Sequence, residues 1–309
     1  MSPLRETLAD YLALRRSLGH KLDDAERQLG RFVAHLEGLG AETVTLEAAI
    51  GFILDPDLDP ASTNPSRRLT AVRGFARHLA GADPRTEIPP AGLVVFRRRR
   101  RRPYLFSDAE VAALMRAGAA TSTAPLRSAT IETLIGLLAV TGLRVGEALR
   151  LDRGDVDLDD AVITVRATKF GKSRQVPLAA STAEALAAYA AVRDRLQPAP
   201  QASTFFVSLA GTPLAYSHFC ATFTKALRAT GIGTGSPVRP RIHDLRHSFA
   251  VRTLIGWHRD GLDVAALLPR LSTYLGHREP RYTYTYLTAT PELLGYAAAR
   301  LQAHQAARP

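Results

Sequence analysis

The sequence is poor in cysteine and in long apolar runs. Cys220 is the single cysteine among 309 residues, which excludes an internal disulfide framework and is typical of a reducing compartment. The best apolar stretch, residues 131–143, is too short to span a bilayer and contains Glu132. The first residues lack the pattern of a signal peptide. These absences argue against a secreted disulfide-stabilised protein and a membrane protein, and they predict a cytoplasmic one.

Lysine is also scarce. It supplies four of the 40 basic residues, and two of these, Lys169 and Lys172, flank one predicted hairpin turn. The arginine excess has a simple alternative explanation in the codon use of a GC-rich genome. Chemically, however, a guanidinium cannot release a proton at neutral pH, whereas an ammonium can. A general acid drawn from the basic residues of this chain would therefore be a lysine.

Positive charge is abundant. The formal net charge is +11 and the isoelectric point is about 10.3, which indicates a polyanionic partner. Because no membrane feature accompanies the charge, nucleic acid is the better prediction. An apolar content of 46% with 22% charged residues describes a folded protein long enough for two domains. The sequence contains no GxxxxGK[ST] loop for a nucleotide.

Residues 1–90 are predicted to form a small all-helical domain. Apolar residues recur at spacings of three and four up to Gly19 and again, through Leu39, up to Gly40. Thr45 is a predicted cap for a third helix that ends at Leu54. In the fourth helix the apolar residues face inward, and the other face carries Arg67, Arg68, Arg73 and Arg77. That basic face is interpreted as a phosphate contact, with a solvated surface as the alternative.

Residues 91–103 are predicted to be a basic linker. Six consecutive arginines, Arg97, Arg98, Arg99, Arg100, Arg101 and Arg102, precede Pro103. Such a block repels itself and stays extended without a counter-charge. It is interpreted either as a disordered linker or as a strap along the DNA backbone, and the two are compatible if it orders only on DNA.

Residues 104–309 are predicted to form a second domain that is mainly α with a small β-sheet. A capping box at Ser107 opens it, and residues 161–166 and 174–178 are strand-like on either side of a turn at Phe170-Gly171. Helices are predicted over residues 126–140, 143–151, 182–196, 216–230, 244–257, 264–275 and 291–301.

Several separated residues in this domain carry chemistry. Arg144 follows the glycine break at Gly142, and Glu147 lies on the same helical face. Taken alone, the two are an ordinary surface pair; taken with the other residues, Glu147 is interpreted as an acid that orients Arg144. His243 and Arg246 are three residues apart, so that one helical turn presents both to one point. His277 follows a predicted helix stop. Two arginines suit a phosphate clamp, and histidines suit proton transfer.

Other interpretations of these residues remain open. His243 and His247 have the i,i+4 spacing of zinc ligands, although no third ligand is evident. Tyr282, Tyr284 and Tyr286 alternate at strand period, which taken alone indicates an aromatic packing face. The acidic residues between 152 and 160 are interpreted as a polar turn.

In their order and in their amino-acid sequences, these segments resemble the catalytic boxes of the tyrosine recombinase (phage integrase) family. The resemblance covers roughly residues 105–295 and rests on Thr141-Gly142-Leu143-Arg144, Thr168-Lys169, His243-Asp244-Leu245-Arg246-His247, Leu275-Gly276-His277 and Tyr286-Leu287-Thr288. It implies Arg144, Lys169, His243, Arg246, His277 and Tyr286 as catalytic residues, with no metal and no cofactor. Tyr284 is the alternative nucleophile. Counting back from Val176-Pro177-Leu178 selects Lys169 over Lys172, which with Arg174 becomes a DNA contact.

The resemblance also implies a fold and a partner. A SAM-like helical core-binding domain and a mixed α/β catalytic domain form a C-shaped clamp on double-stranded DNA, and the tail helix links a homo- or heterotetramer with related recombinases. The implied activity is site-specific strand cutting and rejoining at the bacterial nucleoid, for a mobile element and possibly of the type encoded as trios. Alternatives are an Xer-like chromosome-dimer resolvase, a type IB topoisomerase and a non-enzymatic DNA-binding relative.

Overall fold

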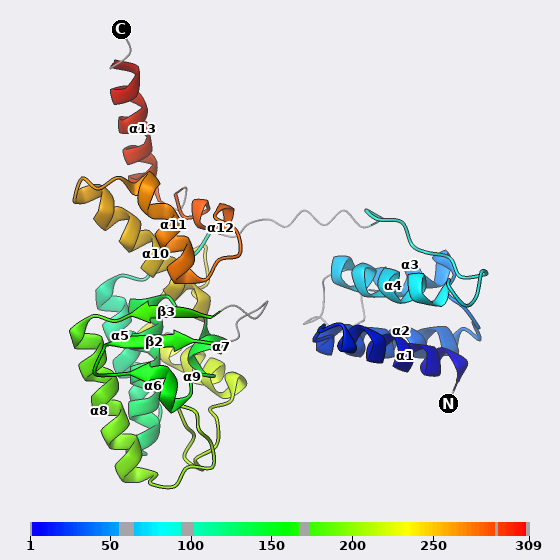
Figure 1. Cartoon of the computed structure of the whole chain (residues 1–309), viewed down its shortest axis with the longest axis horizontal. Helices are drawn as coiled ribbons and strands as arrows, with labels where there is room; N and C mark the ends of the chain where they lie inside the picture. Colours follow the sequence, from blue (N-terminus) through cyan, green and yellow to red (C-terminus); the bar gives the residue numbers. More distant parts are fainter. Residues whose placement is uncertain (1, 56–64, 94–101, 167–172, 288–289, 307–309) are drawn as a thin grey trace. The chain divides into compact units, whose positions relative to one another are not determined.

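The computed structural model describes residues 2–55, 65–93, 102–166, 173–287 and 290–306. Contacts along the chain divide the protein into two compact units, Met1–Arg100 and Arg101–Pro309. Figure 1 labels the helices and strands of each unit.

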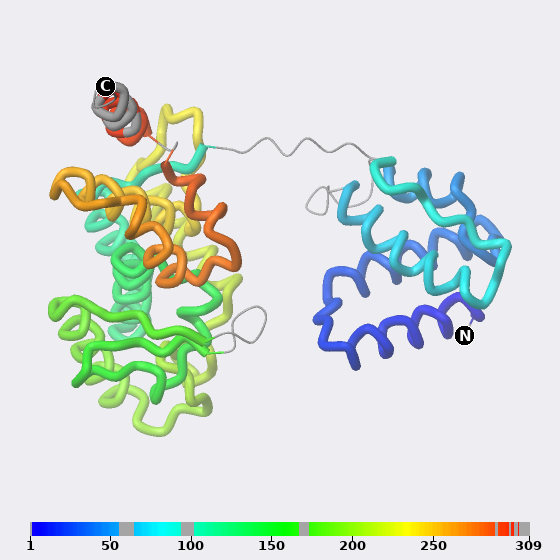
Figure 2. Tube along the Cα trace, turned by 45° about the horizontal axis from the view of Figure 1, so that its top comes forward, coloured from blue at the N-terminus to red at the C-terminus, as the bar shows by residue number. Residues whose placement is uncertain are grey.

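The first unit is a small helical bundle, and its helices are coloured blue to cyan in Figure 2. Its elements are α1 (Pro3–Ser17), α2 (Asp23–Gly38), α3 (Leu46–Leu54) and α4 (Pro65–Leu79). The hydroxyl oxygens of Ser2 and Thr45 accept hydrogen bonds from backbone N–H groups at the starts of α1 and α3. The predicted cap at Thr45 is thus confirmed. Aromatic side chains that are at most 1% exposed fill the centre of the bundle: Phe32, Phe52 and Phe75.

One arginine of α4 lies inside this unit. Arg68 is 2% exposed, and its Nη1 donates to three carbonyl oxygens at the end of α3. The acceptors are Phe52 at 3.4 Å, Ile53 at 3.2 Å and Asp55 at 2.9 Å. The last carbonyls of a helix have no partner within it, so Arg68 satisfies groups that burial would otherwise leave unpaired. The prediction that Arg68 faces outward is therefore wrong, whereas Arg67 and Arg77 are exposed as predicted.

The second unit is mainly helical with a small sheet, as the sequence predicts. Its helices are α5 (Asp108–Ala119), α6 (Pro125–Thr141), α7 (Val145–Ala148), α8 (Ala180–Leu196), α9 (Tyr216–Thr230), α10 (Ile242–Arg259), α11 (Val264–Leu275), α12 (Arg281–Tyr284) and α13 (Pro291–Ala306), with a 3-10 turn, η2 (Arg153–Asp155). The capping box at Ser107 is present, and α9 and α11 have the predicted bounds.

The sheet has three antiparallel strands in the order β1 (Val156–Asp157), β2 (Val162–Val165) and β3 (Arg174–Pro177). Ile163 pairs with Val176, and Val165 pairs with Arg174. The predicted hairpin is thus confirmed in its strands. The predicted turn between them, with Lys169 and Lys172, lies outside the described residues.

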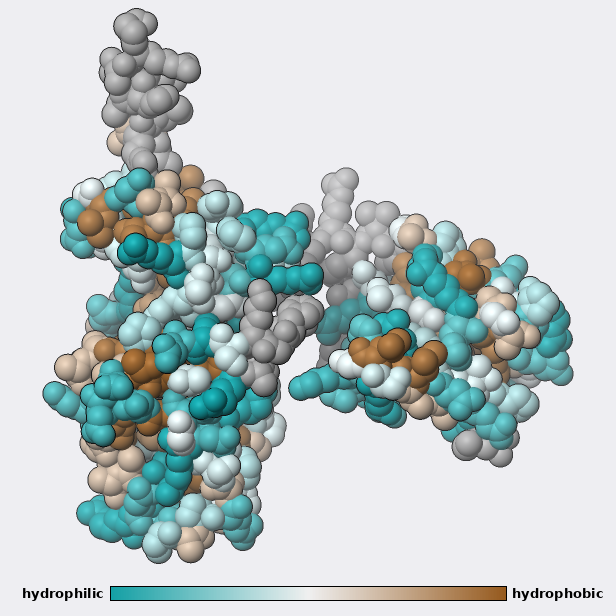
Figure 3. All heavy atoms as spheres, viewed as in Figure 1, coloured by the Kyte–Doolittle hydropathy of each residue, from teal (hydrophilic) through white to brown (hydrophobic). Residues whose placement is uncertain are grey.

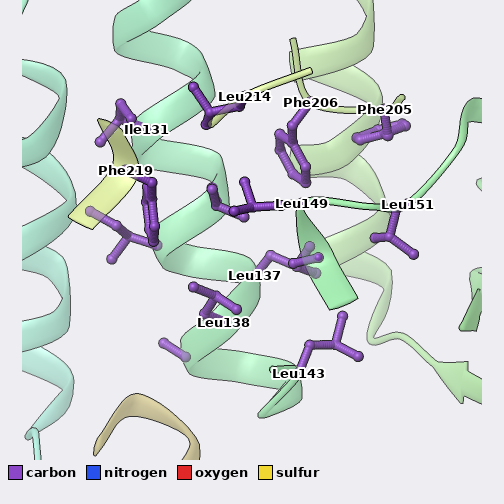
Figure 4. Packing of buried hydrophobic residues seen from close by; sticks show 14 of the residues in the cluster. Ile131, Leu137, Leu138, Leu143, Leu149, Leu151, Phe205, Phe206, Leu214 and Phe219 are labelled. Atoms are coloured by element: carbon purple, nitrogen blue, oxygen red, sulfur yellow. The ribbon is translucent and has the colours of Figure 1, made fainter. Parts of the chain in front are cut away.

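Two apolar clusters hold the second unit together. Figure 4 shows the larger one, where side chains of α6 such as Leu137 and Leu138 pack among leucines and aromatic rings from several segments, including Phe206 and Phe219. A smaller cluster joins α10 and α11 to Tyr286 and to Leu293 of α13. The catalytic candidates come from the segments near the smaller cluster.

Several predicted details differ from the structure. Leu18 and Leu39 were predicted to end the apolar faces of the first two helices, but they are 66% and 60% exposed, since the chain turns at Gly19 and Gly40 immediately after them. Helix α7 has four residues instead of the predicted span 143–151. The alternating tyrosines do not form a strand, because residues 281–284 are the helix α12.

The visible face in Figure 3 is largely hydrophilic, with hydrophobic residues in separate small areas. Within the described part of the chain, no helix combines the length and the hydropathy that a membrane span requires.

Replacing Arg68 tests whether its guanidinium stabilises the first unit by binding the carbonyl oxygens at the end of α3. Arg68→Met keeps much of the side-chain volume but leaves the α3 carbonyls without their donor. We expect the first unit to lose about 2–4 kcal/mol of unfolding free energy, because hydrogen bonds from a charged donor to buried carbonyls are lost. Hydrogen exchange of the amides of α3 and α4 in the full chain measures this loss. The matched control is Arg77→Met, an exposed arginine of the same helix; equal effects of the two substitutions would contradict the assignment.

Candidate active site

Among the predicted catalytic residues that the structure describes, Arg246 of α10 is the most deeply buried. It is 2% exposed. Its Nη1 donates to the carbonyl oxygen of Gly142 at 2.7 Å, and its Nη2 donates to that of Leu275 at 2.6 Å. Burial, and next the positive charge of Arg144, lower the pKa of Arg246 to about 10. This guanidinium therefore joins the ends of α6 and α11, and a second cation lies near it.

Arg144 stands at the start of α7, two residues after Gly142, the glycine that ends α6. Its Nη1 donates to Oε1 of Glu147 at 2.8 Å, and its Nη2 donates to the carbonyl oxygen of Gly276 at 3.1 Å. The side chain remains 40% exposed. Arg144 is thus held on one side and open to a ligand on the other.

Glu147 receives a second arginine, from β3. Nη1 and Nη2 of Arg174 donate to its two oxygens at 3.3 and 2.8 Å, and Nε donates to the carbonyl oxygen of Tyr274 at 2.8 Å. Burial opposes ionisation of Glu147, but the hydrogen bonds and charges of Arg174 and Arg144 outweigh it and lower the pKa to about 2. The carboxylate is therefore the shared anchor of both arginines.

The structure does not support the DNA contact predicted for Arg174. Its side chain is 9% exposed, and its guanidinium is taken up by Glu147 and Tyr274. A DNA contact was predicted for Arg174 because it stands beside a basic hairpin turn. The contacts of the described residues give it a supporting role inside the site.

Two glycines allow these contacts. Gly142 and Gly276 end α6 and α11 in the left-handed region, at φ of 61° and 67°. A Cβ on Gly142 would lie 2.6 Å from Cδ1 of Phe249, and one on Gly276 would lie 2.6 Å from Nη1 of Arg174. Glycine is therefore required at both positions by conformation and by space.

The histidines lie among these cations. Nδ1 of His277 is hydrogen-bonded to Oγ1 of Thr283 at 2.8 Å. The ring of His243, which reaches solvent, lies edge-on to that of His247, with 4.8 Å between the ring centroids. Partial desolvation and the neighbouring positive charges lower the pKa of His243 and of His247 to about 4 and that of His277 to about 3. All three imidazoles are accordingly neutral at pH 7.

Tyr286 is the tyrosine that reaches this group. It is 4% exposed, with its ring 5.4 Å from that of His247 and 6.0 Å from that of His277. Its hydroxyl also interacts with Arg246 and raises the pKa of that guanidinium against the effect of burial. Tyr282 and Tyr284 are 45% and 51% exposed. The geometry thus favours Tyr286 over Tyr284 as the nucleophile.

The structure brings together most of the predicted site residues: Arg144, Glu147, His243, Arg246, His277 and Tyr286. Lys169, Lys172 and the arginines 97–101 lie outside the described residues, and Arg102 is exposed. Thr283 was not predicted, since a threonine within an alternating Tyr-Thr run carries no signal of its contact with His277. Across the described residues, no group of three or more His, Cys, Asp or Glu side chains is placed to hold a metal ion.

The arrangement is suited to an anion. Two guanidinium groups and three imidazoles lie together, and one carboxylate, itself shared with Arg174, faces them. The lowered pKa values of Arg246 and the histidines have a common contribution, the positive charge of their neighbours. A bound phosphate would relieve that repulsion and accept hydrogen bonds from the same groups.

Comparison with known proteins places this geometry in a family. The sequence profile described as the phage integrase family matches residues 105–292. The integrase/recombinase y4rB of Sinorhizobium fredii is 43% identical over 98% of this chain and 98% of its own length. The tyrosine recombinase XerD of Mycobacterium tuberculosis is 31% identical over 92% of each chain.

Solved structures share the fold. The integrase of the transposon Tn1549, in complex with transposon right-end DNA, has a TM-score of 0.66 at 17% identity and covers 96% of this chain and 98% of that chain. A lambda integrase tetramer bound to a Holliday junction has a TM-score of 0.59 at 17% identity, over 90% of this chain and 78% of that chain. By its profile match and by its close relative, this chain belongs to the phage integrase family of tyrosine recombinases.

Proposed function

We propose that this protein is a site-specific DNA recombinase that cuts and rejoins DNA strands through a 3′-phosphotyrosyl intermediate. The observation that carries the proposal is the placement of the Tyr286 phenol against Arg246 and His277, two residues that also lie near Arg144. A nucleophile and an anion site at one point are what attack on a phosphodiester requires.

Cleavage follows from the charges in the site. The oxygen of Tyr286 attacks the phosphorus, a new P–O bond forms, and the bond to the 5′ oxygen breaks. Arg144 and Arg246 bind the non-bridging oxygens, where negative charge grows. His243, neutral in the free protein, accepts the phenolic proton, and the negative phosphate favours that protonation.

The leaving group also needs a proton. We assign this step to Lys169, from its place in the sequence between β2 and β3. The ammonium gives its proton to the departing 5′ oxygen, a contribution on the order of 10²–10⁴ in rate. The phosphotyrosyl bond retains the energy of the broken linkage, so a 5′-hydroxyl can reverse the reaction on a new strand without ATP.

We further propose that the first unit and the basic linker bind duplex DNA, as a core-binding domain connected by a strap. The exposed Arg67 and Arg77 of α4 and the exposed Arg102 support this assignment, together with the net charge of +11. Arg73 is partly buried and donates to the carbonyl oxygen of Pro89, so it contributes less to such a face. A C-shaped clamp is the arrangement that this proposal requires on DNA.

The protein is proposed to act as a tetramer on DNA, through α13. The lambda integrase relative is a tetramer on a Holliday junction, which supports that assembly. The first turn of helix α13 carries the buried Leu293, and in Figure 1 the helix extends beyond the other helices of its unit. A homotetramer or a mixed tetramer with related recombinases is compatible with this tail. The site of action is then the bacterial nucleoid, in the cytoplasm.

The biological role proposed is mobility of a genetic element. The similarity to a transposon integrase supports it, and so does the y4rB relative, whose identity is higher than that of XerD. Resolution of chromosome dimers is the second candidate, favoured by the XerD relatives. A type IB topoisomerase would relax a supercoiled plasmid that lacks any target site, and we expect no prompt relaxation here.

Substitution of the nucleophile tests the proposed chemistry. On a nicked suicide duplex that carries the cognate site, wild type should form a covalent protein–DNA adduct and Tyr286→Phe should form none. The control is Tyr284→Phe, which removes an exposed hydroxyl two residues away and should leave the adduct intact. Denaturing gels measure both. If Tyr286→Phe still formed the adduct and Tyr284→Phe did not, the nucleophile would be Tyr284.

A leaving group that needs no proton tests the assigned acid. Lys169→Ala should cleave about 10²–10⁴-fold more slowly than wild type, because the 5′ oxygen then departs unprotonated. A 5′-thio substrate should restore the rate, since a thiolate leaves without a proton. Lys172→Ala is the matched control and should show no such selective rescue. Rescue of Lys172→Ala in place of Lys169→Ala would reassign the acid.

The Glu147 anchor makes the site sensitive to acid. Because its pKa falls from 4.5 to about 2, Glu147 contributes stability that is present above pH 4.5 and lost as the pH falls toward 2. The shift corresponds to about 3 kcal/mol. Urea unfolding of the second unit across this range should show that loss in wild type and not in Glu147→Gln. The exposed Glu184 supplies the control variant Glu184→Gln, which should follow wild type; a Glu147→Gln profile parallel to wild type would disprove the linkage.

A further inference from the structure

The neutral ring of His277 can carry its proton on either of two nitrogens. Burial, and then the positive charges of neighbouring arginines, lower the pKa of His277 to about 3, so its ring is neutral at pH 7. These arginines are Arg246, Arg144 and Arg174, and His243 would add to their effect only when it is protonated. A neutral imidazole carries one N–H, on Nδ1 or on Nε2, and its other nitrogen can only accept. The position of that proton decides whether His277 donates to a phosphate oxygen or repels it.

The hydroxyl of Thr283 fixes this position. Thr283 is 0% exposed, and in the part of the chain that the structure describes its hydroxyl has one partner, Nδ1 of His277 at 2.8 Å. A hydroxyl has one proton to donate, and a buried donor without an acceptor is costly. If Nδ1 were protonated, the two protons would compete and that of Thr283 would have no acceptor. The hydroxyl therefore donates to Nδ1, and the ring proton belongs on Nε2.

The chain around Thr283 keeps this contact in place. The N–H of Thr283 donates to the carbonyl oxygen of Pro280 at 2.8 Å, and the carbonyl oxygen of Thr283 accepts the N–H of Tyr286 at 3.0 Å. Tyr286 in turn lies nearly parallel to the His277 ring, at an interplanar angle of 26°. One residue thus contacts the imidazole through its side chain and the predicted nucleophile through its backbone.

We propose that Thr283 is a positioning residue: its buried hydroxyl holds the ring proton of His277 on Nε2, so that Nε2–H donates to a non-bridging oxygen of the bound phosphodiester. The identity of that acceptor rests on the proposed recombinase function, whereas the tautomer is a property of the chain alone. Tyr282 and Tyr286 contact His277 through their rings, whereas Thr283 forms a hydrogen bond with one ring nitrogen. The hydroxyl of Thr283 is therefore the group that selects which nitrogen of His277 carries the proton.

The tautomer can be measured directly. Nitrogen-15 NMR of histidine-labelled full-length protein distinguishes an Nδ1–H from an Nε2–H imidazole, and His277→Gln identifies the His277 signals among the nine histidines. We expect Nε2–H in wild type. In Thr283→Val, which replaces the hydroxyl with a methyl group of similar size, we expect a mixture of tautomers. An Nδ1–H ring in wild type, or no change in Thr283→Val, would overturn the proposal.

Cleavage kinetics test the consequence of the tautomer. On the suicide duplex, the single-turnover rate of Thr283→Val should fall about 10- to 100-fold, by analogy with the partners that orient metal-bound imidazoles. Thr283→Ser keeps the hydroxyl and should recover most of the rate. Affinity for the duplex should be similar in all three proteins. Failure of Ser to rescue, or a loss confined to DNA affinity, would assign Thr283 a purely packing role.

Thr285→Val is the matched control. Its hydroxyl donates to the carbonyl oxygen of Tyr282 at 2.7 Å, so that substitution should leave the tautomer and most of the rate unchanged. The two measurements also separate this inference from the proposed function. If wild type gives no adduct but the NMR result is as expected, the recombinase proposal fails and the assignment of Thr283 to the His277 tautomer stands.

Discussion

The site depends on two like charges held close together. Arg246 is fixed by two backbone carbonyls, Arg144 by one carbonyl and one carboxylate, and the same carboxylate also neutralises Arg174. One carboxylate therefore binds two of the three guanidinium groups, and its charge acts on Arg246 without a hydrogen bond between them. The repulsion that remains lowers the stability of the empty site and is relieved when an anion enters, so the chain is built in advance for the charge distribution that it is proposed to bind.

The same constraint explains the glycines of two sequence boxes. Thr141-Gly142-Leu143-Arg144 and Leu275-Gly276-His277 each end a helix in the left-handed region, and in each case the carbonyls at that end accept from a clamp arginine. A helix end normally leaves its carbonyls to water. Here two helix ends meet around Arg246, and any larger residue would push against Phe249 or Arg174. The residues of these two segments are therefore required for packing carbonyl oxygens around the guanidinium groups as well as for the chemistry.

Apolar periodicity was sufficient for most helices of both units and for the hairpin strands, although not for α12. The resemblance to the catalytic boxes of the family was what pointed to the group formed by Arg144, His243, Arg246, His277 and Tyr286. They were not sufficient for Arg68 and Arg174. A basic residue at a surface-like position of a helix or beside a turn looks solvated, and only the folded chain shows a carbonyl or a carboxylate within reach. Thr283 was missed for a related reason, since its partner, six residues back, lies across a turn that the tyrosine alternation concealed.

The burial of Tyr286 links the nucleophile to the tail. Its ring belongs to the same apolar cluster as Leu293 at the start of α13, together with side chains of α10 and α11. Because interiors are closely packed, a shift of α13 changes the space available to that ring. If α13 contacts a neighbouring protomer, as proposed, assembly and cleavage are then coupled through side chains in one cluster. A phenol that is 4% exposed has to be released before it can reach DNA, and the packing of Leu293 against that cluster is where a partner could act on it.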